Sequence, residues 1–232
     1  MQSRMKFVAK RDSRSVVVPG HNFLFNWFKP FISGKKVLDI GCWSGPLEEL
    51  MKDENCEVVG IDIEDAPLKV AQKKYPMFKF LNHSIAEEIP KKIGPFDVVL
   101  YFMVIEHIPK GSELSSLINI NKSMKKNGLL FMNTMNDTFL SNLLDPAYFF
   151  GHRHYKKKNL TRMLKKAGFK IEEIHYNAGF YTTGHMLMLY FFKHVLRRKE
   201  PRSRFFDSLM KRDYRNKGFA EIDILARKVA TV

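Results

Sequence analysis

Residues 39–47 have the sequence DIGCWSGPL and follow a short apolar run that begins at Lys36. Gly41 and Gly45 stand where a strand would turn sharply into a helix, and glycine permits the positive φ angles and close backbone approach that such a turn needs. In an open parallel sheet, ligands bind beyond the carboxyl ends of the strands, where unpaired N–H groups at a helix start can donate to them. This stretch therefore predicts a strand, a ligand-binding turn and a helix.

The same stretch argues against a dinucleotide cofactor. A pyrophosphate needs bare backbone, so its binding turn has the form G-x-G-x-x-G with a small central residue. Here Trp43 is at the central position and Pro46 at the sixth. Asp62 ends the next predicted strand 21 residues after Gly41, about the separation at which a carboxylate reaches the ribose hydroxyls of an adenosine. The pattern disfavours a nicotinamide or flavin enzyme and still fits an adenosine ligand.

The rest of the chain alternates short apolar runs with amphipathic stretches, which is typical of parallel strands joined by crossover helices. The sequence therefore predicts a doubly wound α/β protein. Predicted helices span 46–52, 65–74, 112–126 and about 158–167, and the third is expected to stop at Asn127-Gly128. Predicted strands span 36–41, 57–62, 78–82, 96–102, 128–134, 169–177 and 220–229.

Several of these segments resemble the motifs of class I S-adenosylmethionine-dependent methyltransferases. VLDIGCWSG (37–45) resembles the first motif of that family, and VVGIDI (58–63) its acidic second-strand motif. FDVVLYFMVIEHI (96–108), MKKNGLLFMNTMN (124–136) and LTRMLKKAGFKIEEI (160–174) are similar to its later strands and helix. The resemblance covers nearly the whole chain. It implies a Rossmann-like methyltransferase fold with a seven-stranded, mostly parallel sheet whose last strand is antiparallel, and S-adenosylmethionine as cofactor, with S-adenosylhomocysteine as product.

The resemblance also implies which residues contact the cofactor. The glycine-rich turn would line the methionine part, Asp39 would hold the turn or meet the amino group, and Asp62 would bind the ribose hydroxyls. Since S-adenosylmethionine has no phosphate, the indole of Trp43 is expected to point away from the cofactor or to cap its methionine end. The residues assigned to the cofactor are Asp39, Gly41, Cys42, Gly45, Asp62, Ile63, Ser84, Ile85 and Tyr101.

A sulfonium methyl group is already electrophilic, so the protein has mainly to align a nucleophile and exclude water. A general base is needed only for a weak nucleophile such as a hydroxyl. His107, with Glu106 beside it, is the candidate base; the alternative is that the pair anchors the turn after the fourth strand. His152, His154 and Tyr155 are weaker candidates, because each could be exposed on the surface.

The segment MVIEHI (103–108) is similar to the E-V-x-E-H segment of ubiquinone-pathway O-methyltransferases and small-RNA 2′-O-methyltransferases. In those families the two glutamates and the histidine help to bind a divalent metal. Met103 replaces the first glutamate here, so the sequence predicts no metal, although His152 or His154 could complete a site.

Two absences narrow the methyl acceptor. No N/D-P-P-Y/F motif follows the fourth strand, which disfavours the exocyclic amines of adenine and cytosine, and neither Cys42 nor Cys56 is placed to attack cytosine. The sequence predicts O-methylation of a small molecule, a sugar or a lipid-linked glycan. The alternatives are an RNA methyltransferase acting on a 2′-oxygen or a base, and a non-catalytic protein that binds S-adenosylmethionine.

Residues 1–35 are expected to form a helical edge or lid around HNFLFNWFKPF (21–31), before a cofactor-binding domain at 36–232. That domain includes a basic, apolar excursion at about 180–219, in which residues 193–217 carry ten Lys or Arg and three Asp or Glu. The excursion has three interpretations: a helix packed on the sheet or a second copy, a helix on an anionic membrane, and a nucleic-acid contact. The membrane is favoured over nucleic acid, and the oligomeric state stays open. The predicted apolar helix face consists of Met188, Phe191, Phe192, Val195 and Leu196.

Composition sets the remaining bounds. The 232 residues include 39 Lys or Arg against 24 Asp or Glu, a net charge of +15 that fits either an acidic partner or a solvated basic surface. Two cysteines indicate a reducing compartment, and neither a secretory signal nor a membrane-spanning run is present in the sequence. The expected location is cytoplasmic, with peripheral membrane contact as an option.

Overall fold

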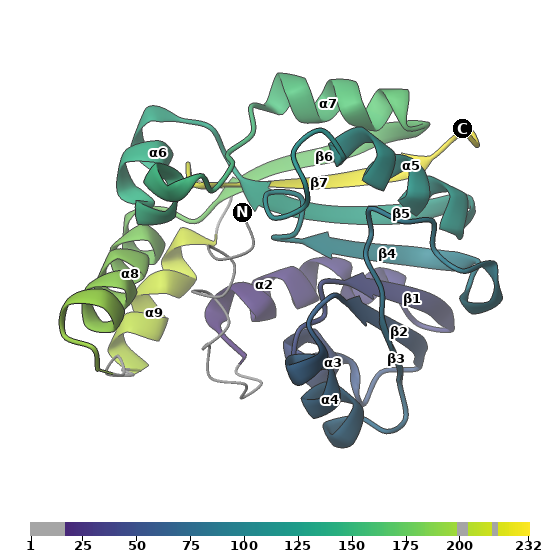
Figure 1. The fold of residues 1–232 in the computed structure, drawn as a ribbon, viewed down its shortest axis with the longest axis horizontal. Helices are drawn as coiled ribbons and strands as arrows, with labels where there is room; N and C mark the ends of the chain where they lie inside the picture. The colour runs from purple at the N-terminus through teal and green to yellow at the C-terminus, as the bar shows by residue number, and fades with distance from the viewer. Residues whose placement is uncertain (1–16, 199–203, 215–217) are drawn as a thin grey trace.

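A computed structural model describes residues 17–198, 204–214 and 218–232. Within these ranges, seven strands form one sheet with helices on both faces (Figure 1). The predicted fold is confirmed, including the antiparallel last strand. The strands are β1 (Lys35–Ile40), β2 (Cys56–Asp62), β3 (Lys79–Asn82), β4 (Phe96–Phe102), β5 (Met124–Met135), β6 (Phe169–Asn177) and β7 (Glu221–Lys228).

The strand order is β3-β2-β1-β4-β5-β7-β6. β1 pairs in parallel with both β2 and β4, whereas β7 pairs antiparallel with both β5 and β6. The direction of winding reverses between β1 and β4, and this is where open α/β sheets leave a crevice for a ligand. The glycine-rich turn follows β1 and the segment MVIEHI follows β4, so both border that crevice.

The helices cover the two faces of the sheet in distinct sets. α5 (Glu113–Ser123) and α7 (Lys157–Lys166) pack on one face, where Leu117, Ile120, Leu160 and Leu164 are fully buried. α2 (Pro19–Phe28) and α3 (Pro46–Met51) pack on the other. α4 (Asp65–Lys74) lies beside β3, and the short 3-10 helices η1 (Lys29–Phe31) and η2 (Lys91–Ile93) precede β1 and β4.

The predicted N-terminal edge helix forms as α2 and η1 and belongs to the core. Phe28 is fully buried, and the ring of Trp27 meets Phe131 of β5 edge-on at 4.9 Å. Residues 1–16 of the predicted lid lie outside the described residues, so a lid over the ligand stays a prediction.

The predicted end of the helix at 112–126 is wrong. α5 ends at Ser123, and Met124 already pairs with Phe96 in the β4–β5 ladder. The register then shifts, and Asn127 takes a left-handed conformation with φ of 61° before Leu129 pairs with Val98. The Asn-Gly pair therefore lies at an irregularity within β5 and does not end the helix, because the chain already pairs with β4 from Met124 onward.

The excursion between β6 and β7 consists of α8 (Phe180–Tyr190), a π-helical turn η4 (Phe191–Val195) and α9 (Arg204–Asp213). Two elements that the sequence did not predict lie after β5, namely α6 (Phe139–Leu144) and η3 (Pro146–Phe150). α6 and α9 both contact α8, and in Figure 1 all three gather beyond the carboxyl ends of β4 and β5. Within the described ranges, every helix is too short or too polar to cross a membrane.

The predicted apolar face of the excursion is largely left uncovered. The π-helical turn interrupts the α-helical spacing from which this face was predicted. Phe191, Val195 and Leu196 are 50%, 65% and 42% exposed, so the sheet does not bury them.

Candidate active site

The glycine-rich turn brings the loops after β1 and β4 into contact. Gly41 and Gly45 have φ of 78° and 84°, in the left-handed region that favours glycine. A Cβ placed on Gly41 would lie 2.4 Å from Cγ2 of Val104, and one on Gly45 would lie 2.4 Å from the Tyr75 ring. Both glycines are therefore needed for conformation and for space, as a close-packed ligand turn requires.

Asp62 joins the end of β2 to the glycine-rich turn. One carboxylate oxygen accepts the backbone N–H of Trp43 at 2.9 Å, and the other accepts that of Glu64 at 2.9 Å. A carboxylate offers about four lone-pair positions, so Asp62 can still accept from ribose hydroxyls. The arrangement fits the predicted cofactor role of this residue.

Asp39 and Glu48 lie buried beneath the turn. Burial raises the pKa of Asp39 to about 7, while a hydrogen bond with Glu48 lowers it and the charge of Asp62 raises it. Burial, and next the charge of Asp39, raise the pKa of Glu48 well above its usual value. Burial also raises the pKa of the Cys42 thiol, which stays neutral. Sequence reasoning missed Glu48, because an acid in the first turn of a helix is ordinarily an exposed residue that stabilises the helix dipole.

The remaining predicted cofactor residues differ in accessibility. Ile63 is 55% exposed, and the Ser84 hydroxyl accepts the N–H of Ala86 at 3.2 Å, so both can border a ligand. Ile85 is buried. Tyr101 is fully buried, with its hydroxyl 3.3 Å from that of Ser116 on α5, so its side chain supports the core beneath β4.

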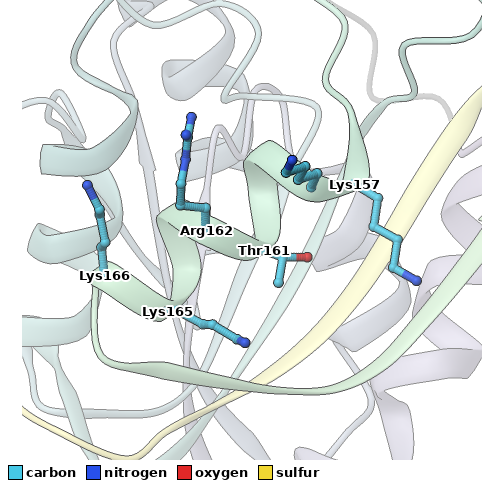
Figure 2. Close-up of a pocket in the computed structure, with 6 residues that line it drawn as sticks. Lys157, Thr161, Arg162, Lys165 and Lys166 are labelled. Carbon is cyan, nitrogen blue, oxygen red and sulfur yellow. The ribbon is translucent and has the colours of Figure 1, made fainter.

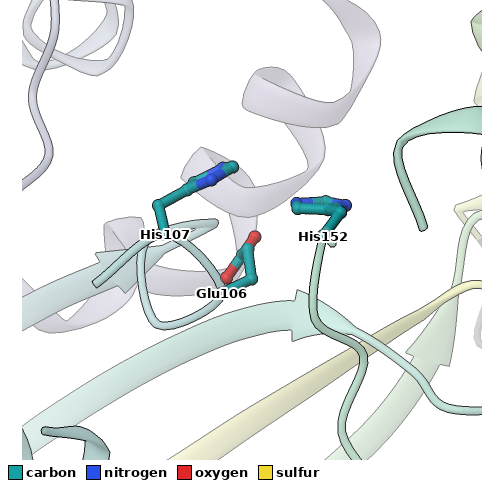
Figure 3. A group of neighbouring side chains, drawn as sticks. All are labelled: Glu106, His107 and His152. Atoms are coloured by element: carbon teal, nitrogen blue, oxygen red, sulfur yellow. The ribbon is translucent and has the colours of Figure 1, made fainter. Parts of the chain in front are cut away.

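Glu106, His107 and His152 meet at the carboxyl end of β4. Figure 3 shows the two imidazole rings side by side with the Glu106 carboxylate between them. The ring centroids are 4.9 Å apart and the rings are 26° from parallel. Burial raises the pKa of Glu106 to about 7, and Thr134 of β5 donates to one of its oxygens at 2.9 Å. His107 is exposed, whereas the side chain of His152 is only 14% exposed.

Asp145 orients two of the histidines. One of its carboxylate oxygens lies 2.8 Å from Nδ1 of His152 and 2.9 Å from Nε2 of His154. Burial by itself raises the pKa of Asp145, but the hydrogen bonds with the two imidazoles outweigh burial and lower it below the usual value. Nδ1 of His154 is 2.7 Å from the side-chain oxygen of Asn142, and the side chain of His154 is fully buried. His154 is thus a structural residue, while His152 faces the site.

Arg153 joins the segment after η3 to the loop after β4. Its guanidinium donates to the carbonyl oxygens of Glu106 at 3.1 Å and Ile105 at 2.8 Å, and also to that of Ile108 and to the Glu113 carboxylate. The Tyr155 hydroxyl donates to the Ile105 carbonyl at 3.0 Å, so this predicted candidate is also structural. We call these hydrogen bonds of Arg153 the clamp. Its only signal in the sequence was an arginine between two histidines.

The acidic and histidine side chains after β4 and on either side of η3 include two sets of donor atoms that could hold a metal. Glu106, His107 and His152 each offer one ligand atom, and these atoms lie within 4.8 Å of one another, as do those of Asp145, His152 and His154. An ion must lie in the plane of each imidazole that binds it. Because His107 and His152 are stacked nearly face to face, their rings would have to turn before both could bind one ion.

A separate hollow lies along the outer side of α7. Its lining residues all belong to this one helix, and most of them are lysine or arginine (Figure 2). They are Lys157, Lys158, Thr161, Arg162, Lys165 and Lys166. Its walls belong to a single element away from the crevice between β1 and β4, so it is a surface feature separate from the candidate site.

The sequence of this chain is similar to those of known proteins. A family model described as a methyltransferase domain matches residues 10–174. The ubiquinone biosynthesis O-methyltransferase of Acinetobacter baylyi is 27% identical over 167 residues, which cover 63% of this chain and 69% of that protein. The protein of the same name from Pseudomonas aeruginosa is 35% identical over 120 residues, 48% of this chain and 50% of that protein. The chain thus spans about half to two thirds of the length of these curated relatives.

Solved structures show the same fold. A SAM-dependent methyltransferase from Archaeoglobus fulgidus has a TM-score of 0.61 at 21% identity, covering 88% of this chain and 91% of that one. A TehB-like SAM-dependent methyltransferase from Corynebacterium glutamicum has a TM-score of 0.59 at 13% identity, covering 98% of this chain and 94% of that one.

Proposed function

Because the chain belongs to the methyltransferase domain family, we propose that it transfers the methyl group of S-adenosylmethionine to an oxygen atom of a small molecule. The family match confirms the predicted class of enzyme, and with it the predicted cofactor. The oxygen acceptor is inferred from two observations. The curated relatives named above are O-methyltransferases, and a weakly nucleophilic hydroxyl requires the kind of acid–base group found after β4.

The residues around the crevice divide the work between cofactor and acceptor. S-adenosylmethionine supplies an electrophilic methyl group when bound. The glycine-rich turn and Asp62 are placed to hold its methionine and adenosine parts, with Ile63 and Ser84 at the edge. Gly41 packs against Val104, so the loop that carries Glu106 and His107 directly adjoins the turn. An acceptor bound between the turn and this loop would lie close to the methyl group, and proximity of this kind accelerates transfer.

His107 and His152 form the acid–base group of this proposal, with Glu106 beside them. The observation that carries the proposal is the Asp145–His152 contact of 2.8 Å at Nδ1. A neutral His152 that donates to Asp145 through Nδ1 keeps Nε2 as a proton acceptor, and Asp145 fixes the ring in that orientation. Proton removal from a hydroxyl acceptor is the step that such an imidazole accelerates.

A labelled-methyl assay on fractionated cell extract tests the acceptor. We expect label from S-adenosylmethionine in a small-molecule fraction, either water-soluble or lipid-soluble, and not in RNA. Label confined to RNA would instead establish the alternative RNA methyltransferase.

Single substitutions then test the acid–base group. His152→Asn and His107→Asn should each lower kcat on the identified acceptor, by about 10²–10⁴-fold for the residue that acts as base. Binding of S-adenosylhomocysteine should be unchanged in both. His175→Asn on β6, where the imidazole bonds to Glu173, is the matched control and should retain kcat. Full kcat in both site variants would contradict the proposed base.

A lipid-linked acceptor, including a lipid-linked glycan, is the finer proposal, and an exposed apolar rim supports it. Aromatic and aliphatic side chains that would ordinarily be buried are exposed on α6, η3, α8, η4 and α9, beyond the carboxyl ends of the strands that carry the site. Exposed basic residues lie among them, which favours an anionic membrane over a second protein. The apolar rim consists of Phe139, Leu143, Phe149, Phe150, Phe180, Phe191, Val195 and Phe205, and the basic residues are Arg197, Arg198, Arg204, Lys211 and Arg212.

Vesicle co-sedimentation tests this contact. The full chain should pellet with vesicles that contain anionic lipid, less with zwitterionic vesicles, and less at high salt. Replacing Phe149 and Phe150, which are 67% and 81% exposed, by serine should weaken pelleting. Met77→Ser is the control, since Met77 is 61% exposed in the turn between α4 and β3 and does not belong to the rim. Pelleting that ignores both salt and the rim variant would exclude the membrane proposal.

A further inference from the structure

Three carboxyl groups are buried together beneath the glycine-rich turn. Asp39 at the end of β1, Glu48 on α3 and Asp62 at the end of β2 are 3%, 0% and 9% exposed. Asp62 has two backbone N–H donors, but the buried Glu48 carboxyl lies against Asp39 and its own backbone N–H and has no donor from any other described residue. Within the described residues, no lysine or arginine forms a salt bridge with any of the three. Burying charge in this way is costly unless a cation arrives to compensate it.

Glu48 contrasts with its neighbour Glu49 on the same short helix. Glu49 is exposed enough to bind Lys52, Lys74 and the Tyr75 hydroxyl, and the hydrogen bond from Lys52, followed by those from Lys74 and Tyr75, lowers its pKa to about 2. Glu48 makes no such contacts and lies under the turn, with one oxygen 3.5 Å from a Cβ placed on Gly45. Glu49 thus stabilises the fold through three side chains, whereas among the described residues the Glu48 carboxyl has only Asp39 and its own backbone N–H as partners.

We propose that Asp39 and Glu48 share one proton in the cofactor-free protein, and that they together bind the ammonium group of the methionine part of S-adenosylmethionine, releasing that proton to solvent. This inference rests on the S-adenosylmethionine site of the proposed function and adds Glu48 to it. The released proton leaves both carboxylates charged, opposite a ligand that carries an ammonium and a sulfonium.

The surroundings of the pair determine which group can supply the proton. The titratable groups that face it are Cys42 from the turn, Asp62 from β2 and Tyr75 beside Gly45. The raised pKa of Cys42 keeps its thiol protonated in both states. The raised pKa values of Asp39 and Glu48 keep one proton on the pair near neutral pH, and a bound cation favours its loss.

Calorimetry on the wild-type chain tests the proton release directly. S-adenosylhomocysteine keeps the ammonium and does not react, so its binding enthalpy can be measured near pH 7 in buffers of different ionisation enthalpy. We expect release of up to about one proton per ligand, and a Kd that tightens by up to about tenfold per pH unit while the pair titrates. 5′-Methylthioadenosine lacks the amino-acid part and should bind without releasing a proton. Equal release with both ligands, or none with either, would overturn the inference.

Variants of the two neighbouring glutamates separate this role from a structural one. Glu48→Gln should raise the apo melting temperature, because it replaces a buried ionisable group beside Asp39 and Asp62 by a neutral amide. It should also weaken binding of S-adenosylhomocysteine, reduce the number of protons released and leave 5′-methylthioadenosine binding unchanged. Glu49→Gln is the control and should keep wild-type proton release. Wild-type affinity and proton release in Glu48→Gln would overturn the inference alone, whereas no binding of S-adenosylhomocysteine by the wild-type chain would overturn the proposed function as well.

Discussion

Replacing Arg153 should loosen the loop after β4, which carries Glu106 and His107. It should leave the glycine-rich turn and Asp62, which are proposed to bind the cofactor, unchanged. The guanidinium of Arg153 donates hydrogen bonds to three carbonyl oxygens of the loop after β4, those of Ile105, Glu106 and Ile108. It also donates to the Glu113 carboxylate. A hydrogen bond from a charged donor contributes about 1.5–3 kcal/mol, but the side chain is 20% exposed and water can replace part of the loss. For Arg153→Met we therefore expect a loss of about 2–3 kcal/mol in the free energy of unfolding.

The same substitution should lower kcat. Without the clamp, the loop after β4 is no longer fixed to the segment that carries His152, and a displacement of about 1 Å at a reacting group can cost about 100-fold in rate. Urea unfolding gives the stability, and the labelled-methyl assay gives kcat. Binding of S-adenosylhomocysteine should be unchanged, because the hydrogen bonds of Arg153 go to the loop after β4 and to α5.

Two further variants control this experiment. Arg153→Lys keeps the charge but loses the planar fork that reaches several carbonyls at once, so it should be intermediate in both measurements. Arg162→Met removes an exposed arginine from α7 and should leave both unchanged. A loss below about 1 kcal/mol with full kcat in Arg153→Met would refute the idea that this clamp assembles the site.

Four other outcomes are expected. Dialysis against EDTA should leave the initial rate unchanged, because the stacked imidazoles of Figure 3 do not point at one ion; a loss that one divalent cation restores would contradict this. Gly41→Ala should destabilise the fold by about 1–3 kcal/mol through its clash with Val104, as measured by urea unfolding, whereas Gly34→Ala, with φ of 69° and open space, should show backbone strain alone. Trp43→Gly should weaken S-adenosylhomocysteine modestly or not at all by calorimetry, and a large gain in affinity would show that the indole obstructs the site. The pKa of Glu106 is about 7 in the folded chain and 4.5 in the unfolded chain, so the free energy of unfolding falls as the pH rises through this window. In urea unfolding, Glu106→Gln should therefore lose less of this free energy between about pH 5 and pH 8 than the wild-type chain.

The positions of the residues proposed to hold the cofactor could be predicted, because these residues lie in contiguous segments. Gly41 directly follows β1, Gly45 directly precedes α3 and Asp62 ends β2, and the carboxyl ends of neighbouring parallel strands meet at one edge of a sheet. Local sequence thus determines both where these residues fall and which way they face. The alternation of strands and helices fixed the same edge for the segment after β4.

The acceptor side could be predicted only in part, because tertiary contacts assemble it. Glu106 and His152 are separated by 46 residues, and they meet because Arg153 and Tyr155 bond to the loop after β4. α6 and η3, which position Asp145, are too short to show a helical period, and side chains of Thr138 and Asp145 cap them. Their apolar residues are exposed, so the usual signal of a buried helix face is missing.

Glu48 and Glu49 show the same limit on a smaller scale. Adjacent positions on a helix differ by about 100° in direction, so one glutamate faces solvent and the other faces the sheet. A six-residue helix gives no period from which to tell them apart, and the identical residue type carries opposite consequences for pKa. Only the packing of α3 against β1 decides which carboxyl is buried.

Trp43 shows why a motif can tolerate a residue that its usual form excludes. The residue has φ of 49°, in the left-handed region where glycine is normally favoured, and its N–H donates to Asp62 at 2.9 Å. The turn therefore requires a backbone conformation and a donor at this position, and both are supplied by the main chain. A large side chain adds conformational strain of about 1–2 kcal/mol but does not remove the donor. Size at the central position would exclude a ligand only if that ligand had to lie against bare backbone there, as a pyrophosphate must.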